Sequence, residues 1–495
     1  MAADEYDVIV VGGGPAGSTV GSVLTRAGHS VLLFEKEQFP RDHVGESMLP
    51  FCYPLFDDLG VRDELARTFV RKPGVRFVDR EGAVFTNWCF SHVIKDESFL
   101  SFHVDRASLD TILLNNARRL GVEAREGHRV TGVGLDQPDH VTVRTRDNDG
   151  TEAEHRARFL VDASGRDAFV GTKFGWREPR PELDRTAVWS HFTGVRMAGG
   201  LEEGASVIVY IGEEKKGWIW IFPLGPDRIT AGVVMQNSYL RRRRAELLEE
   251  GDDDWKTAML HDELRASPFV TDLLEGTTQA LPTMVDGDYS YEVRNHHGRN
   301  YAMIGDARGF IDPIFSSGVF LSMKTAYLVG EAVHRHLLDP ARDGDVGGEG
   351  WGEGSALTKA YEAVDGAYNL VHRMIRLFYD PHAVTWAAIG AEKQVHKAHE
   401  SAMAVGHYML AGDFFENHDK YNRFFALLED RRGFERFREH VVERPEFQDS
   451  SCRLPWEVAF GRRLERFSPE EALGFNPEPV TVGGDSEADH GADAP

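Results

Sequence analysis

The chain has 495 residues, of which 41% are hydrophobic and 27% charged, an ordinary balance for a protein with a buried core. Its length predicts two or three packed regions rather than one. The formal net charge of -24 argues against nucleic acid or an anionic membrane surface as a partner. The first residues lack a signal-peptide pattern, and no apolar run approaches a membrane-spanning length.

The three cysteines, Cys52, Cys89 and Cys452, are scattered along the chain. Their spacing matches neither a metal site nor a disulfide framework. We therefore expect reduced core or surface thiols, no metal site and a cytoplasmic protein.

The most informative segment lies near the start of the chain. Apolar residues 6–11 predict a strand, a helical pattern then continues to Ala27, and apolar residues 30–34 predict a second strand. A glycine-rich turn inside such a βαβ unit is typical of a dinucleotide site, where the helix N-terminus holds the phosphates. A turn without a ligand is the alternative, but strand, turn, helix and terminal acid in register favour a dinucleotide.

Each glycine of this turn has a distinct expected role. Gly12 allows the tight turn, Gly14 lets a pyrophosphate approach the backbone, and Gly17 packs the helix against the strand. Glu35 ends the second strand at the expected spacing and can accept hydrogen bonds from a ribose.

Further elements follow in chain order. Residues 104–120 predict a helix that carries Arg106 and Asp110, and residues 141–144 and 159–165 predict strands, the second ending in a glycine turn. The later segments are β-rich stretches at 187–192, 205–211, 217–223 and 229–234, a short strand over 301–304, a glycine- and glutamate-rich loop at 347–354, and a mostly helical region over 355–440.

A second glycine-acid turn favours FAD over a nicotinamide cofactor. Gly305 and Asp306 follow a predicted strand and precede a helix that begins near Ser316. An aspartate there can bind the ribityl hydroxyls, while the helix N-terminus faces the electron-rich pyrimidine edge of a flavin. Arg41 and Arg106 could contact the cofactor phosphates or the flavin.

With these motifs the sequence resembles the flavin-dependent halogenases, within the hydroxylase-like FAD superfamily. The resemblance extends from residue 6 to about residue 430, and Phe222 stands where isoleucine is usual. The segments that carry it are Gly12 to Gly17, Val44 to Ser47, Lys72 to Phe77, Gly217 to Pro223 and Gly305 to Gly318.

The resemblance implies an α/β protein with a Rossmann-type FAD-binding domain, an inserted β-sheet substrate domain and a C-terminal helical region. We expect a discontinuous FAD-binding domain that is interrupted by the sheet domain and followed by the helices. The boundaries are 1–180 and 286–345 for the FAD-binding domain, 181–285 for the sheet domain, 346–480 for the helical region and 481–495 for a disordered acidic tail.

The family chemistry implies that reduced FAD, oxygen and a halide ion generate hypohalous acid, which halogenates a separate aromatic substrate. Trp218 and Trp220 would line a water-poor passage, and Lys72 would deliver the oxidant as an ammonium donor or as a chloramine. Taken alone, the tryptophans more often fill a core, and Lys72 is more often a solvated lysine. Their combination with the Gly305 motif favours catalysis. Only one complete dinucleotide fingerprint is present, so a separate flavin reductase is the expected partner.

The resemblance also assigns binding residues. The backbone N–H groups of Ser316, Ser317 and Gly318 open a helix and can hold the halide, and an ordinary serine cap is compatible with this role. The residues expected to bind FAD are Gly12, Gly14, Pro15, Ala16, Gly17, Glu35, Lys36, Arg41, Ser47, Arg106, Asp162, Gly305, Asp306 and Gly318.

Phe315 narrows the expected substrate. The tryptophan-halogenating branch carries a glutamate at this position, so phenylalanine favours chlorination of an electron-rich phenol or pyrrole, possibly tethered to a carrier protein. The basic cluster 241–244 could dock an acidic carrier, although a solvated face explains it equally well. The segment 376–380 would close over the active site.

Two other functions compete with this interpretation. A flavin-dependent aromatic hydroxylase or reductase would bind FAD with the same glycines, but would not require Lys72 or the tryptophan motif. A non-catalytic escort protein on the same fold would bind a prenylated protein without flavin and would be colourless.

Overall fold

The computed structural model describes residues 5–212, 217–287, 290–338, 355–380, 386, 402–429, 432, 452 and 454–460. Within these ranges, no helix combines the length and apolar character that a membrane crossing requires. The predicted loop at 347–354 and the acidic tail at 481–495 lie outside the described residues.

The first sheet confirms the predicted βαβ unit. Strand β1 (Glu5–Val11) lies at its centre and pairs in parallel with β2 (Val31–Phe34) and β10 (Glu152–Asp162). Helix α1 (Pro15–Arg26) connects β1 to β2 and packs against α4 (Arg106–Leu120) and α9 (Gly318–Leu338). The remaining strands of this sheet are β7 (Glu123–Arg125), β8 (His128–Gly134), β9 (Val141–Asp147), β19 (His297–Gly298) and β20 (Tyr301–Met303).

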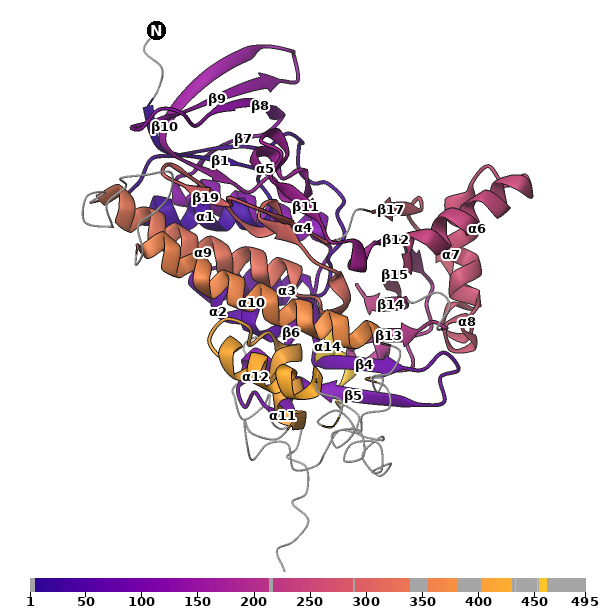
Figure 1. Cartoon of the computed structure of the whole chain (residues 1–495). Coiled ribbons are helices and arrows are strands. Elements are labelled where there is room, and N and C mark those ends of the chain that lie inside the picture. Colours follow the sequence, from indigo (N-terminus) through magenta and orange to yellow (C-terminus); the bar gives the residue numbers. More distant parts are fainter. Residues whose placement is uncertain are drawn as a thin grey trace, which may run out of the picture.

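The second sheet is mainly antiparallel and lies beside the first (Figure 1). Two of its strands, β4 (Gly74–Val78) and β5 (Phe85–Cys89), come from a segment that the sequence placed in the FAD-binding domain. The predicted boundaries therefore missed a contribution from residues 74–89. Its other strands are β12 (Arg185–Thr193), β13 (Ser206–Tyr210), β14 (Trp218–Pro223), β15 (Arg228–Gln236), β16 (Thr278–Gln279) and β17 (Met284–Asp286).

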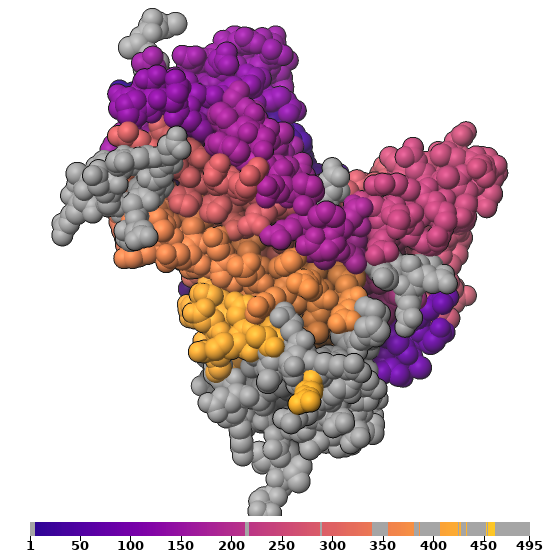
Figure 2. All heavy atoms as spheres, in the orientation of Figure 1, coloured from indigo at the N-terminus to yellow at the C-terminus, as the bar shows by residue number. Residues whose placement is uncertain are grey.

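Strand β14 divides its side chains between two hydrophobic cores. Trp218 and Trp220 belong to the large core that α9 shares with α10 (Ala356–Tyr379). Ile219 and Ile221 belong to a second core, which also contains Leu240, Met259 and Val270. This alternation is the two-residue period of a strand. The helices α6 (Asn237–Glu249), α7 (Trp255–Arg265) and α8 (Pro268–Leu274) form a lobe at the right of Figures 1 and 2.

Shorter elements surround these layers. Strand β3 (Val70–Lys72) pairs with β6 (Ser101–His103) in an antiparallel ribbon. A three-stranded sheet contains β11 (Arg177–Pro179), β18 (Tyr291–Val293) and β21 (Gly309–Phe310). The short helices include α2 (Tyr53–Asp58), α3 (Arg62–Thr68) and α5 (Phe169–Lys173).

The C-terminal region is mostly helical where the structure describes it. Helix α10 (Ala356–Tyr379) runs beside α9, as Figure 1 shows, and buries an apolar face that extends from Leu357 to Phe378. The remaining helices are α11 (Ala402–Ala411), α12 (His418–Glu429) and α14 (Trp456–Phe460).

The prediction for the cysteines was wrong. Cys89, at the end of β5, forms a disulfide with Cys452, 363 positions away in the chain. Cys52 is free and buried. Spacing along the chain could not show this pair, because the fold brings the two thiols together from distant segments. The cysteines therefore no longer support the expectation of a reducing compartment.

Candidate active site

A cavity of about 550 Å³ lies between the glycine turn of the first sheet and strand β14 of the second. It brings together most of the residues that the sequence singled out. Those that line it are Gly12, Gly14, Pro15, Ala16, Glu35, Lys36, Arg41, Ser47, Arg106, Trp218, Trp220, Asp306, Ser316 and Gly318. Those that do not line it are Gly17, Lys72, Asp162, Gly305, Phe315 and Ser317.

The glycine turn is sterically constrained at two positions. Gly12 has φ 101°, and a Cβ atom there would lie 2.3 Å from the Ala163 carbonyl oxygen. A Cβ atom at Gly17 would lie 1.9 Å from the carbonyl oxygen of Gly12. At Gly14 the nearest atom to such a Cβ is Nη2 of Arg41, at 3.5 Å. Gly12 and Gly17 are therefore required by the protein itself, whereas Gly14 leaves space in the cavity.

This difference predicts separable effects on stability and cofactor binding. Gly14→Ala should keep the thermal stability of the flavin-free protein, because Gly14 has φ -68° and room for a methyl group. It should weaken FAD affinity by about tenfold or more, because the methyl group occupies space where a pyrophosphate would approach. Gly17→Ala should lower both the thermal stability of the flavin-free protein and its FAD affinity. Fluorescence titration with FAD and thermal melts of the flavin-free protein measure the two effects, and unchanged FAD affinity in Gly14→Ala would contradict the assignment.

The carboxylate of Glu35 is held at the end of β2. Its Oε2 accepts a hydrogen bond from the Gly13 amide at 2.8 Å, and its Oε1 accepts one from the Glu37 amide at 2.9 Å. This anchors an acceptor at the position where a ribose hydroxyl is expected. Lys36 instead forms an ion pair with Asp167 at the rim of the cavity.

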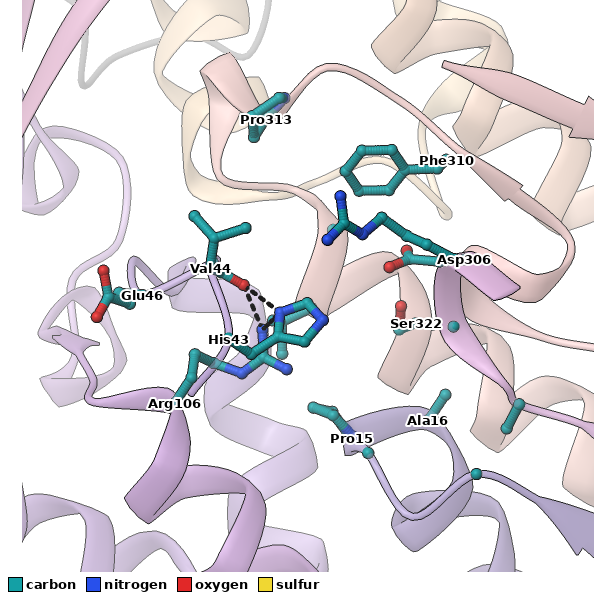
Figure 3. Close-up of a pocket in the computed structure, with 18 of the residues that line it drawn as sticks. Pro15, Ala16, His43, Val44, Glu46, Arg106, Asp306, Phe310, Pro313 and Ser322 are labelled. Carbon is teal, nitrogen blue, oxygen red and sulfur yellow. Dashed lines mark hydrogen bonds between the residues drawn. The ribbon is translucent and has the colours of Figure 1, made fainter. Parts of the chain in front are cut away.

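Two arginines of the cavity lining form a charge cluster with the buried Asp110. Arg106 binds Asp110 through two hydrogen bonds of 2.8 and 2.9 Å, and also donates to the Val44 carbonyl at 2.8 Å (Figure 3). Arg41 Nη1 lies 3.3 Å from Asp110 and has no hydrogen-bond partner among the described residues. The Arg41 guanidinium, which also borders Gly14, is therefore placed to bind a phosphate.

His43 and Glu46 line the cavity although the sequence did not single them out. His43 Nδ1 lies 2.7 Å from the Val44 carbonyl. Burial and the Arg106 charge lower the pKa of His43 to about 3, so its imidazole is neutral. Glu46 pairs with His191 at 2.7 Å from the neighbouring strand β12. Both residues belong to the segment around the Gly45 turn, so that motif was the available signal.

Asp306 projects into the cavity from the turn after β20 (Figure 3). Burial raises its pKa to about 6, while the charges of Arg166 and Arg106 act in the opposite direction. The preceding Gly305 has φ 57°, which favours glycine. The carboxylate is thus available as an acceptor for cofactor hydroxyls. Asp162 differs, since its two oxygens accept hydrogen bonds from the amides of Ser164 and Val170 and shape the adjacent loop.

The turn before α9 has the geometry expected of an anion site. Ser316 adopts the left-handed conformation with φ 54°, which non-glycine residues rarely adopt. Gly318 begins the helix, and both residues line the cavity. The Ser317 hydroxyl is buried and has no hydrogen-bond partner among the described residues. Backbone N–H groups at such a helix start attract anions.

The paired tryptophans face the same cavity from β14. Their ring centroids are 5.7 Å apart. Trp220 Nε1 donates to Thr230 Oγ1 at 3.2 Å, and Trp218 Nε1 donates to the Tyr379 hydroxyl at 2.8 Å. Tyr379 ends helix α10, so the segment 376–380 does contact this side of the cavity. Both buried indoles thus contribute apolar surface to the lining of the cavity.

Lys72 is buried in the ribbon of β3 and β6 rather than exposed in the cavity. Its Nζ donates to the Met48 carbonyl at 3.0 Å and lies 5.3 Å from the centroid of the Phe90 ring. Burial lowers the pKa of Lys72 to about 7. Val70 pairs with His103, so Lys72 and His103 share one face of the ribbon. The His103 ring stacks at 5.4 Å on Phe222, which lines the cavity.

Phe315 lies in an aromatic cluster directly before the Ser316–Gly318 turn. Its ring contacts Phe378 at 6.1 Å and Trp386 at 5.7 Å between centroids. The side chain is 3% exposed, so it fills this space with apolar surface.

The basic cluster 241–244 lies on α6, away from the cavity-lining strands. Arg243 forms ion pairs with Glu246, Glu250 and Asp262. Arg244 lies over the ring of Trp255 at 4.9 Å. Arg243 and Arg244 therefore already contact other residues of the protein.

Several other cavity residues escaped the sequence analysis because no local pattern marks them. They come from the loop after β10, from the short strands β11 and β21, and from the first turns of α9. The additional residues that line the cavity include Ser164, Arg166, Arg177, Phe310 and Ser322.

The cavity has the donors and the space that FAD requires. The glycine turn and Arg41 suit the pyrophosphate, Glu35 suits a ribose, and Asp306 suits the ribityl chain. The same cavity is thus lined by the glycine turn, which suits a dinucleotide, and by Trp218.

Comparison with known proteins agrees with this geometry. Residues 5–344 match the model of the FAD binding domain family. A tryptophan 2-halogenase from Chondromyces crocatus is 34% identical over 331 residues, 66% of this chain and 60% of that protein. A 1H-pyrrole-2-carbonyl-(peptidyl-carrier protein) chlorinase from Pseudomonas fluorescens is 30% identical over 346 residues, 66% of this chain and 75% of that protein.

Solved structures share the same architecture. The flavin-dependent brominase Bmp2 superposes with a TM-score of 0.71 at 25% identity, over 88% of this chain and 100% of that chain. The flavin-dependent halogenase CmlS shares the fold, with a TM-score of 0.69 at 24% identity, over 95% of this chain and 76% of that chain. The family model and the coverage of the pyrrole chlorinase show that the chain belongs to the FAD binding domain family and, within it, to the flavin-dependent halogenases.

Proposed function

We propose that the protein uses reduced FAD, oxygen and a halide ion to halogenate an electron-rich aromatic ring. One observation carries this proposal: a single cavity is lined both by the glycine turn and by Trp218, Trp220 and the Ser316 turn. When bound, reduced FAD would supply two of the four electrons that reduce oxygen, and the halide would supply the other two as it is oxidised. The protein itself must hold the cofactor, bind the halide, exclude water and direct the oxidant.

Each of these tasks has candidate residues in the proposed site. Arg41 and the N-terminus of α1 hold the phosphates, and the backbone amides of Ser316 to Gly318 bind the halide. The indoles of Trp218 and Trp220 exclude water and keep the substrate away from the flavin.

Lys72 is the proposed group that delivers the oxidant to the ring. With a pKa of about 7, both its amine and its ammonium form are accessible near neutral pH. Its position behind His103 and Phe222 places it beyond the wall of the flavin cavity. In this proposal the oxidant forms in the flavin cavity and is used at Lys72, outside that cavity.

The proposed substrate is a phenol or pyrrole, chlorinated free or while tethered to a carrier protein. The apolar Phe315 supports an activated ring, which does not need an adjacent carboxylate. The relatives divide on this point, since one is named a tryptophan 2-halogenase and another acts on a carrier-bound pyrrole. Docking of an acidic carrier at the basic cluster 241–244 has little support, because Arg243 already forms ion pairs with Glu246 and Asp262.

A product assay tests this proposal directly. We expect the purified protein to carry FAD, to remain oxidised with NADH alone, and to form a halogenated product when a flavin reductase and chloride or bromide are added. The substrates are free and carrier-bound phenols and pyrroles, with free tryptophan as the comparison, and isotope patterns in mass spectra identify the halogen. Efficient conversion of tryptophan would reject the proposed role of Phe315.

The same assay separates the competing functions. A hydroxylated ring without halogen would favour a flavin hydroxylase, and a colourless protein that ignores flavin would favour an escort protein. Rapid bleaching of the flavin by NADH alone would show that no partner reductase is needed.

A further inference from the structure

A chain of hydrogen bonds connects the cavity-lining indole of Trp218 to the turn proposed to bind halide. Trp218 Nε1 donates to the Tyr379 hydroxyl at 2.8 Å. The Tyr379 hydroxyl donates to Asp312 Oδ2 at 2.8 Å. The Ile314 amide donates to Asp312 Oδ1 at 3.1 Å, in the short helical turn that leads to Ser316.

The chemistry of the groups fixes the direction of this chain. An indole nitrogen can only donate, so the Tyr379 oxygen must accept from Trp218. The single hydroxyl proton of Tyr379 is then free to point toward Asp312, which as a carboxylate can only accept. The Tyr379 hydroxyl thus accepts a hydrogen bond from the buried indole N–H of Trp218 and donates one to the buried carboxylate of Asp312.

The surroundings of the chain restrict its movement. Trp218 is 2% exposed and Asp312 is fully buried. Arg185 is also buried, and its guanidinium carbon lies 3.5 Å from the centroid of the Tyr379 ring. Burial raises the pKa values of both Tyr379 and Asp312, while the Arg185 charge opposes both changes. The phenol therefore stays protonated and keeps its hydrogen for Asp312.

We infer that Tyr379 is a positioning residue whose hydroxyl fixes the Trp218 indole relative to the Ser316–Gly318 turn. This inference rests on the proposed function, because it assigns Tyr379 a role in directing the oxidant. Helix α10 ends at Tyr379, so the C-terminal helical region sets the orientation of a residue in the passage.

Loss of the hydroxyl should release the indole. Tyr379→Phe keeps the ring beneath Arg185 but leaves the buried Trp218 N–H without its partner, which is costly in an apolar environment. The indole is then expected to rotate toward another acceptor and to disturb the wall of the passage. Oxidant formed at the flavin would escape or decay instead of reaching the substrate.

The first experiment observes the indole without any reaction. In ¹⁵N-tryptophan-labelled protein each of the nine tryptophans gives one indole N–H signal, and Trp218→Phe identifies the signal of Trp218. We expect Tyr379→Phe to shift this signal and to increase its exchange with solvent. Tyr361→Phe is the matched control, because Tyr361 lies on the same helix and donates a buried hydrogen bond to the Met303 carbonyl at 2.7 Å.

The second experiment measures how the oxidant is used. Halogenated product per reduced flavin consumed should fall about fivefold to tenfold in Tyr379→Phe, as expected for one lost buried hydrogen bond. Free hypohalous acid, captured by an added scavenger, should rise, while FAD affinity and flavin reoxidation stay unchanged. In a Trp218→Phe background, Tyr379→Phe should add no further loss.

The outcomes are distinguishable. An unchanged Trp218 signal in Tyr379→Phe, or a double variant that loses substantially more product than Trp218→Phe alone, would overturn the inference. If the wild-type protein halogenates no substrate, the proposed function fails, but the indole signal still decides whether Tyr379 positions Trp218.

Discussion

Replacement of Lys72 by alanine is expected to leave FAD bound and reoxidised at nearly the wild-type rate, while halogenated product falls by about 100-fold. The magnitude is that of losing a positioned acid or nucleophile. FAD binding and reoxidation should persist because Lys72 lies in the β3–β6 ribbon and does not line the flavin cavity. FAD titration, stopped-flow reoxidation and product mass spectrometry measure the three quantities.

Two further substitutions show how Lys72 acts. Lys72→Met fills the space of the lysine stem without its charge and controls for a cavity left by alanine. Lys72→Arg remains protonated, so it should partly rescue activity if the ammonium polarises the oxidant, and should not if a chloramine forms. Lys173→Met is the surface control, since Lys173 is exposed. Full activity in Lys72→Ala would remove this residue from the mechanism.

The pKa of Lys72 gives this prediction a dependence on pH. Burial lowers the pKa to about 7 in the folded protein from an ordinary value of 10.5. Between these values the unfolded chain binds the proton that the folded chain has released, so wild-type stability rises with pH across this window. Below pH 7 the free energy of unfolding of Lys72→Met should therefore exceed that of the wild type by a few kcal/mol. The difference should shrink toward pH 10, and chemical denaturation at several pH values measures it.

The sequence predicted those parts of the site that local patterns encode. The turn at Gly12 to Gly17 follows from a strand that breaks into glycines, and the structure places it against a cavity. The alternation in β14 placed Trp218 and Trp220 on one face, and the structure divides β14 between two cores accordingly. Such periodicities depend only on neighbouring residues.

Contacts between distant segments could not be predicted in this way. The chain from Trp218 through Tyr379 to Asp312 joins residues 161 and 67 positions apart, and no local pattern marks any of them as partners. The pairing of β4 with β13 likewise depends on the assembled sheet. For the same reason the burial of Lys72 was not visible, since an isolated lysine is usually solvated.

The disulfide leads to the second prediction with a large expected effect. Cys452→Ser should lower the free energy of unfolding by about 2–4 kcal/mol, the usual contribution of a native disulfide. The bridge joins the end of β5 to the segment that precedes α14, and α14 packs on β3, the strand that carries Lys72. Its loss should therefore also loosen the surroundings of Lys72 and lower halogenated product.

Thiol counting and denaturation test this assignment together. Unfolded protein that has never been reduced should expose one reactive thiol, that of Cys52, and three after reduction. A reductant should lower wild-type stability to the level of Cys452→Ser and leave that variant unchanged, while Cys52→Ala should still respond to it. Three reactive thiols before reduction, with no effect of reductant on stability, would show that Cys89 and Cys452 are not bonded. Agreement of all three measurements would instead establish that a covalent link between distant segments supports the strand on which the proposed catalytic lysine lies.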